Sequence, residues 1–142
     1  MLPAWLVDRT DEFKERHEAL IAAATGDNVV QGDIRNDNLI VRDDGSVVFV
    51  DWGMARRGPS WVDPLLVRLE WVEQSVFDEL VGRSPALNRL GDDHVTTFLL
   101  ALGGWLAYRT TVAVDINLPT LNDFRKTESA RLLEGARRRL GL

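Results

Sequence analysis

The chain has 142 residues, a formal net charge of −5 and a hydrophobic share of 45%, which together predict one folded domain with a sizeable core. It has no cysteine, so disulfides, thiolate metal sites and cysteine nucleophiles are excluded, and a reducing, cytoplasmic setting is expected. The negative charge disfavours a nucleic-acid partner, and two histidines are too few for most histidine-based metal sites.

The first 28 residues are expected to be mainly helical. Pro3–Val7 predicts a short helix or docking segment, and Thr10 can cap the longer helix that follows. Gly26 is expected to end that helix, because glycine accepts the left-handed conformation past a helix end.

A short β segment with a polar loop follows. Val29–Val30 predicts a short strand, and the β-branched runs 39–41 and 47–50 predict a hairpin around the Arg-Asp-Asp-Gly turn at 42–45. The loop before this hairpin and the end of its second strand are therefore expected to open on the same side of a small sheet.

The remainder of the chain is expected to be helical. Helices are predicted around 61–71 and over the apolar stretch 95–113, which we expect to be a buried core helix and not a membrane span. Thr120 and Asp123 resemble a capping pair for the last helix. The arginines at 137–139 are expected to be solvated at its C-terminal end, where cations favour the helix dipole. The fold class predicted is thus α+β, mainly helical, with a small β-hairpin.

Three polar side chains of the β segment could carry chemistry. Asp33 and Asn38 lie five residues apart on the loop, and Asp51 follows the second hairpin strand. Phosphoryl transfer from a nucleotide needs Mg²⁺ held by oxygen ligands and a carboxylate that orients the acceptor hydroxyl. Gly32 and Gly53 would let the backbone turn beside the two aspartates. Taken singly, these residues are also ordinary turn formers, but their order around a hairpin favours a site.

At these residues the chain resembles the aminoglycoside phosphotransferase family of the protein-kinase-like fold. The stretch QGDIRNDN at 31–38 is similar to the family's H-x-D-x-x-x-x-N motif, and VDWG at 50–53 is similar to the segment with its metal-binding aspartate. GPSWVD at 58–63 resembles the family's Gly-Pro-x-x-x-Asp segment. The LPTL residues at 118–121, with Phe124 and Arg125, are loosely similar to the family as well.

The resemblance implies a role for each residue. Asp33 would be the catalytic base, and Asn38 and Asp51 would bind Mg²⁺ and through it ATP or another nucleoside triphosphate. Asp63 would steady the loop backbone through hydrogen bonds. Gln31 would support the loop in place of the usual histidine, because an amide also donates and accepts hydrogen bonds.

The resemblance also predicts a single domain over residues 1–142, the C-terminal catalytic lobe of a kinase-like fold, with the N-terminal nucleotide-binding lobe absent. No glycine-rich loop and no strand lysine precede Gln31, and Lys14 is the one lysine there. The isolated chain is therefore expected to bind MgATP weakly and to turn over negligibly.

The function expected is ATP-dependent phosphorylation of a hydroxyl on a small molecule. A cationic aminosugar fits the acidic chain, and choline, homoserine and sugars stay open as acceptors because fold does not fix substrate. The alternative is a non-catalytic interaction module that self-associates through the apolar face left by a missing lobe. A regulatory ligand-binder that keeps only the acceptor pocket is a third hypothesis. No nucleic-acid or membrane partner is expected.

Overall fold

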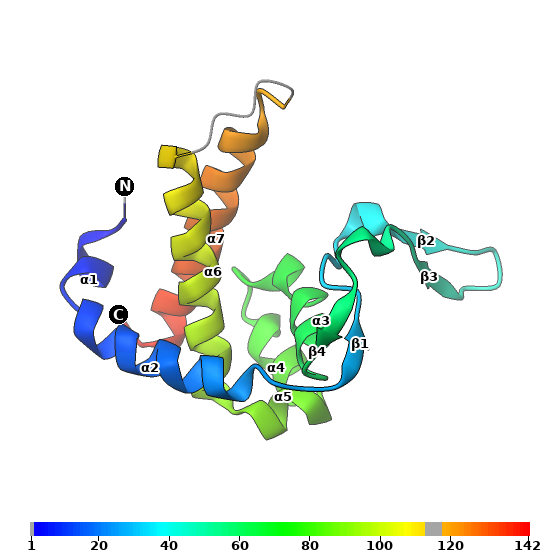
Figure 1. Ribbon diagram of the computed structural model, residues 1–142, viewed down its shortest axis with the longest axis horizontal. Coiled ribbons are helices and arrows are strands. Elements are labelled where there is room, and N and C mark those ends of the chain that lie inside the picture. Colours follow the sequence, from blue (N-terminus) through cyan, green and yellow to red (C-terminus); the bar gives the residue numbers. More distant parts are fainter. Residues whose placement is uncertain (1, 113–117) are drawn as a thin grey trace.

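The computed structural model describes residues 2–112 and 118–142 and is mainly helical (Figure 1). Its centre is a pair of long antiparallel helices, α6 (Asp92–Val112) and α7 (Leu121–Arg139). The short helix α1 (Ala4–Val7) leads into α2 (Thr10–Ala23), which packs against α6. The mainly helical α+β class is therefore confirmed. The apolar stretch predicted at 95–113 is a helix as far as residue 112, where the described range ends; its first half lies in the core, whereas Trp105, Tyr108 and Val112 in its second half are exposed.

The core forms where α6 and α7 meet the short helices. Residues such as Val95 and Leu99 of α6 and Leu132 and Ala136 of α7 are almost completely buried. Ser129 joins the two helices by donating its Oγ hydrogen to the Gly103 carbonyl at 2.8 Å. None of the helices in the described ranges combines the length and the apolar character that crossing a bilayer requires.

Several short helices connect the β segment to α6. They are α3 (Val62–Leu66), α4 (Val76–Gly82), α5 (Pro85–Leu90) and a 3-10 turn at Leu69–Trp71. Ser84 caps α5 with its side chain, and Pro85 occupies the first turn, where its missing N–H costs nothing. The prediction of one helix over 61–71 was wrong: the chain forms the short helix α3 and a separate 3-10 turn there, and α4 and α5 were not predicted.

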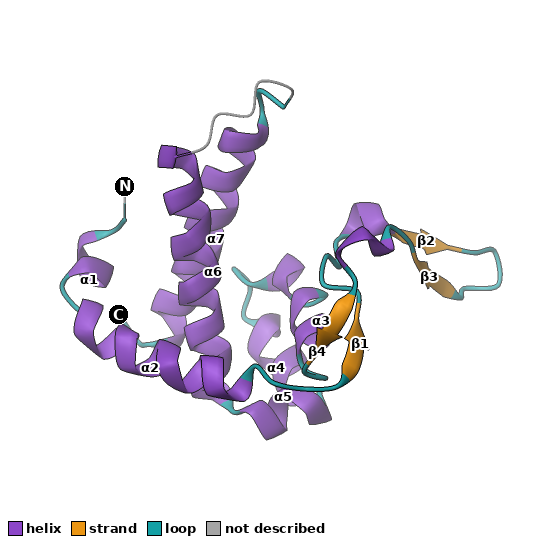
Figure 2. Cartoon of the chain, in the orientation of Figure 1, coloured by secondary structure: helices purple, strands orange, loops and turns teal. Residues whose placement is uncertain are grey.

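The strands form two small antiparallel sheets (Figure 2). β2 (Leu39–Val41) and β3 (Val47–Phe49) make the predicted hairpin, which projects from the helical body. β1 (Asn28–Val30) pairs with β4 (Arg56–Gly58), so Val30 lies opposite Arg56. The second pairing was not predicted, because the sequence Arg-Arg-Gly carries no β signal of its own.

Three predicted helix ends differ from the structure. Thr10 and Thr120 make no capping hydrogen bond with their side chains; Thr10 is already helical and donates to the Val7 carbonyl. Gly26 lies beyond the end of α2 and has no left-handed conformation. Its lack of a side chain is needed for packing, since an added Cβ would lie 2.6 Å from the Cα of Pro59.

The expectation of a solvated arginine run at the end of α7 was also wrong. The Arg139 side chain is 7% exposed and pairs with Asp78 and Asp92, so it ties α7 to α4 and α6. Arg138 donates to the carbonyls of Val72 and Gln74. These arginines fasten the C-terminal helix to the body, and this role depends on tertiary neighbours that sequence spacing does not reveal.

Candidate active site

The loop that follows β1 is held by the Gln31 side chain, which is 1% exposed. Its Nε2 donates to the carbonyls of Val50 (3.0 Å) and Asp51 (2.8 Å), and its Oε1 accepts from the Asp33 amide at 2.7 Å. One side chain therefore joins the backbone of the Asp33 loop to the backbone at the end of the hairpin.

Asp63, in the first turn of α3, holds the same loop from the other side. Its two carboxylate oxygens accept from the amides of Gln31 (2.8 Å) and Gly32 (3.0 Å). Gly32 has φ 78°, a left-handed conformation that glycine adopts without strain. Together Gln31 and Asp63 hold the backbone on both sides of Asp33.

Asn38 connects Asp33 to the hairpin. Its buried side-chain amide donates from Nδ2 to the Asp33 carbonyl at 2.8 Å and to the Asp33 carboxylate at 3.1 Å. Its own carbonyl accepts from the Val50 amide at 3.0 Å, which places the start of β2 beside the end of β3. The structure thus brings Asp33 and Asn38 into contact and puts Asp51 one residue beyond the partner of Asn38.

Asp51 is exposed and adopts a left-handed conformation, with φ 56° and ψ 68°. Among the described residues it is the one non-glycine with positive φ. Such conformations cost energy outside glycine and are concentrated at functional sites. The sequence assigned the turn to Gly53, whereas here Asp51 itself adopts it and Gly53 donates its amide to the Asp51 carboxylate at 3.4 Å.

The donor chemistry of this corner suits a hard cation. Asn38 uses Nδ2 for Asp33, and its Oδ1 accepts no hydrogen bond within the described ranges. Asp51 adds a carboxylate that, among the described residues, accepts only the 3.4 Å bond from Gly53. The described residues contain no cluster of three or more His, Cys, Asp or Glu that could hold a metal alone. One carboxylate and one amide oxygen nevertheless fit Mg²⁺, which usually takes its other ligands from phosphates and water.

Arg35 carries the positive charge of the loop. It forms an ion pair with Asp37, bonding through Nε at 3.0 Å and through Nη2. The hydrogen bond to Asp37 raises the pKa of Arg35, and the negative charges of Asp37, Asp33 and Asp51 raise it further. Arg35 also lies over the ring of Phe124 in α7, 5.8 Å from its centroid. It therefore extends from the loop to the opposite helix.

The pair makes a testable prediction. The hydrogen bond from Arg35 lowers the pKa of Asp37 below its ordinary value. A lowered folded-state pKa adds stability above the unfolded pKa, and this stability is lost as pH falls through the folded pKa. The effect on stability is small because the pair is exposed. We expect Arg35→Gln to return the Asp37 midpoint toward its ordinary value in a carboxyl NMR titration, whereas Arg42→Gln in the hairpin turn leaves it unchanged. An unaltered midpoint in Arg35→Gln would contradict the assigned pair.

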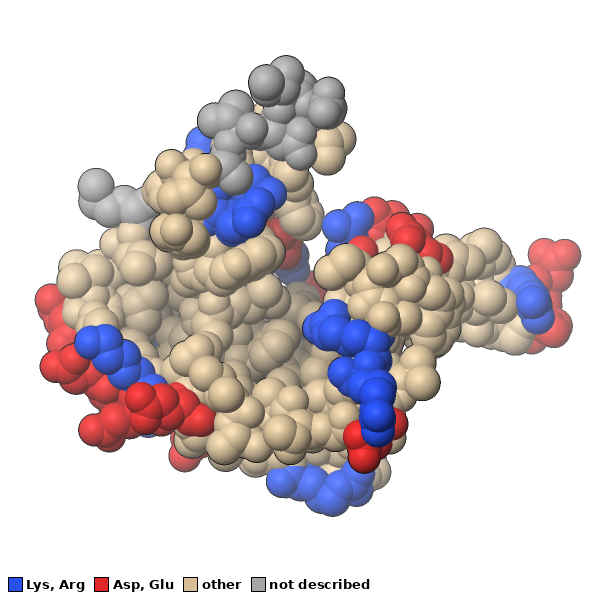
Figure 3. All heavy atoms as spheres, viewed as in Figure 1, with Lys and Arg blue, Asp and Glu red and all other residues tan. Residues whose placement is uncertain are grey.

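A cavity of about 480 Å³ opens beside Asp33. Figure 3 shows the molecule deeply notched between the helical pair and the part that carries the hairpin, with basic residues on both rims. Asp33, Arg35 and Asn36 line the cavity on the loop side, and α6 and α7 line it opposite. Asn38 and Asp51 do not line it, so Asp33 lies between the cavity and the corner that suits a metal.

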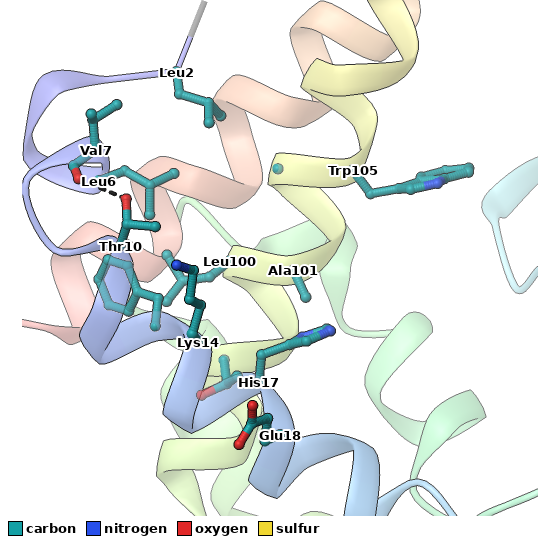
Figure 4. Close-up of a pocket in the computed structure, with 13 residues that line it drawn as sticks. Leu2, Leu6, Val7, Thr10, Lys14, His17, Glu18, Leu100, Ala101 and Trp105 are labelled. Carbon is teal, nitrogen blue, oxygen red and sulfur yellow. Dashed lines mark hydrogen bonds between the residues drawn. The ribbon is translucent and has the colours of Figure 1, made fainter.

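The α6 and α7 wall of this cavity was not predicted as part of the site. Trp105, Leu106 and Phe124 line it, although they lie some 70 residues or more after Asp33 in the chain. The loose similarity over 118–125 was the one available signal for Phe124. A second cavity, of about 420 Å³, lies between α1, α2 and α6 (Figure 4). Trp105 points away from α1 and α2 in this view, and no site residue predicted from the sequence lines this second cavity.

The fold and the site define a mainly helical α+β protein whose acidic loop and hairpin corner suit a cation beside a small-molecule cavity. The family model described as the phosphotransferase enzyme family matches residues 2–96. The chain belongs to this family, and its resemblance to aminoglycoside phosphotransferases is confirmed. No curated protein and no solved structure matches the chain.

Proposed function

We propose that the protein is the catalytic lobe of an ATP-dependent phosphotransferase that phosphorylates a hydroxyl group of a small molecule. The observation that carries this proposal is the arrangement around Asp33. Asp33 lines the cavity, its carboxylate contacts Asn38, and Asn38 adjoins the turn that presents Asp51. Membership of a phosphotransferase family supports this function over other uses of the same residue types.

In this proposal Asp33 orients the acceptor hydroxyl and accepts its proton. The acceptor oxygen forms a bond to the γ-phosphorus, the bond from that phosphorus to the bridging oxygen breaks, and the nucleoside diphosphate leaves. Asn38 Oδ1 and the Asp51 carboxylate would hold Mg²⁺, which supplies charge neutralisation for the phosphates when bound. Gln31 and Asp63 fix the backbone, and the hydrogen bond from Asn38 orients the Asp33 carboxylate.

Nucleotide binding by the 142-residue chain tests this proposal. A ligand that binds only the folded state raises the melting temperature, and the stabilisation grows as the logarithm of one plus the ratio of ligand concentration to dissociation constant. We expect millimolar ATP with Mg²⁺ to raise the melting temperature, and ATP with EDTA or Mg²⁺ alone to raise it much less. Equal shifts with and without Mg²⁺ would contradict a metal–nucleotide site. Weak binding and negligible turnover of the isolated chain stay predictions, and robust phosphorylation by it would contradict them.

A second candidate function rests on the hairpin. Several apolar side chains of β2 and β3 are exposed, with Val41 70% and Ile40 53% exposed. Exposed apolar surface of this kind favours an interaction module that associates with a second copy. Light scattering across concentrations separates the two functions: a dimer abolished by Val41→Lys, together with no Mg²⁺-dependent nucleotide binding, would favour the module.

A further inference from the structure

The cavity beside Asp33 has an apolar wall. Six side chains on the long helices form the side that faces the loop: Leu102, Trp105 and Leu106 on α6, and Leu121, Phe124 and Leu132 on α7. Leu66, Val67 and Leu69 add to the apolar lining of the cavity. A ligand that fills the cavity would thus bury its body mainly against hydrocarbon and aromatic rings, with Asp33 at one end.

Three acidic and three basic side chains line the cavity, and most of them already pair with a neighbouring side chain. Asp33, Glu70 and Glu128 supply the negative charges, and Arg35, Arg125 and Arg131 supply as many positive ones. Glu128 pairs with Arg131 at 2.8 Å. Arg35 pairs with Asp37, as described above, and Arg125 donates from Nη1 to the Asn122 Oδ1 at 2.9 Å. Besides Asp33, Glu70 is the one lining carboxylate that makes no ion pair within the described part of the chain.

This arrangement disfavours a polycation. Several ammonium groups would need several free carboxylates, because a desolvated charge without a partner is costly. The cavity offers two, and Asp33 is committed to the reacting hydroxyl in the function proposed above. The net charge of −5 therefore overstates the negative charge available in this cavity, where Asp33, Glu70 and Arg125 are the charged lining groups without an ion pair among the described residues.

We propose that the acceptor is an uncharged alcohol with an apolar body, a deduction that rests on the phosphotransferase function. Its hydroxyl lies at Asp33 and its body packs between the Leu106 and Phe124 side chains. A volume of about 480 Å³ is in the range of small-molecule pockets and suits a body of several carbon atoms. Polycationic aminosugars are poor ligands of the same cavity.

Linear 1-alkanols from butanol to octanol test this ligand class directly on the 142-residue chain. Burial of one methylene favours binding by about 0.8 kcal/mol, so the dissociation constant should fall about fourfold for each added carbon. Methyl NMR signals of Leu102, Leu106 and Leu132 locate the binding, since these residues line this cavity and not the one between α1, α2 and α6. A polycationic aminosugar at the same concentration should leave these signals unshifted.

Two variants and a matched control assign the binding to the wall. We expect Leu106→Asn and Phe124→Ser each to weaken 1-hexanol binding at least fivefold, and Tyr108→Asn to leave it unchanged. Tyr108 is on the same helix, is 60% exposed and lines neither cavity. Phe124 is 46% exposed, so its replacement leaves the core intact, and far-ultraviolet circular dichroism verifies the fold of each variant.

The outcomes separate this inference from the function on which it rests. Three results would each overturn the apolar acceptor. They are an affinity that does not depend on alkanol length, 1-hexanol binding as tight in both wall variants as in the unchanged protein, and aminosugar-induced shifts at the three leucines. Mg²⁺-dependent nucleotide binding with any of these results would leave the phosphotransferase function standing. Alkanol binding without nucleotide binding would instead remove the phosphotransferase function and with it the role of the alcohol as acceptor.

Discussion

Replacing Gln31 with methionine is expected to lower the free energy of unfolding by about 2–4 kcal/mol, since three partly buried hydrogen bonds are lost and backbone groups stay unpaired. The side chain is 1% exposed and bonds to two carbonyls of the hairpin end and to the amide of Asp33. Methionine has nearly the same length, so packing changes little. Urea denaturation followed by circular dichroism measures the effect.

Gln74→Met is the matched control, because Gln74 is exposed and its side chain makes no hydrogen bond in the described structure. It should change stability by less than about 0.5 kcal/mol. Gln31→His, which restores the residue usual in the family motif, should lose less than Gln31→Met, because imidazole can still donate once and accept once. A Gln31→Met protein as stable as Gln74→Met would show that this side chain does not hold the loop.

Replacing Asp51 with asparagine is expected to weaken Mg²⁺-dependent nucleotide binding at least tenfold, because a metal ligand loses its charge. The folded state should be unaffected, since Asp51 is exposed and asparagine also accepts the left-handed conformation. Calorimetric titration with MgATP, compared with ATP in EDTA, measures the change.

Two further aspartates distinguish the roles. Asp33→Asn should leave MgATP affinity within about threefold. Asp33 lines the cavity, and its proposed role is to accept the proton of the acceptor hydroxyl. Asp43→Asn, an exposed change in the hairpin turn, should leave it unaltered. If Asp51→Asn behaves as Asp43→Asn does, the metal role of Asp51 is wrong.

The sequence predicted the hairpin and the site loop because both depend on local signals. β-branched residues flank a turn that needs positive φ at Gly45, and the structure has φ 80° there. Asp33 and Asn38 are five residues apart on one loop, so their contact also follows from local geometry. The contacts of Asp63 were predictable only through the resemblance, because they span 31 and 32 residues.

Features that depend on distant partners were missed. β4 is a strand only because Arg56–Gly58 pairs with β1, and Arg139 is buried only because Asp78 and Asp92 lie beside it. The turn beside Asp51 was expected to depend on Gly53, because glycine is the usual choice, whereas Asp51 itself is left-handed. The apolar wall of the cavity exists only because α6 and α7 pack beside the loop. Sequence periodicity alone does not indicate that Trp105 and Phe124 lie on the faces that line it.

The most direct test of the metal–nucleotide corner uses Mn²⁺ in place of Mg²⁺. Paramagnetic Mn²⁺ broadens NMR signals of nuclei close to it, so in the presence of ATP it should broaden the side-chain amide of Asn38 and the backbone amides of Asp51 and Gly53 first. Asp51→Asn should abolish that broadening and leave the amides of Gln74 and Tyr108 as they were. Broadening centred on another acidic surface, or unchanged by Asp51→Asn, would contradict the site.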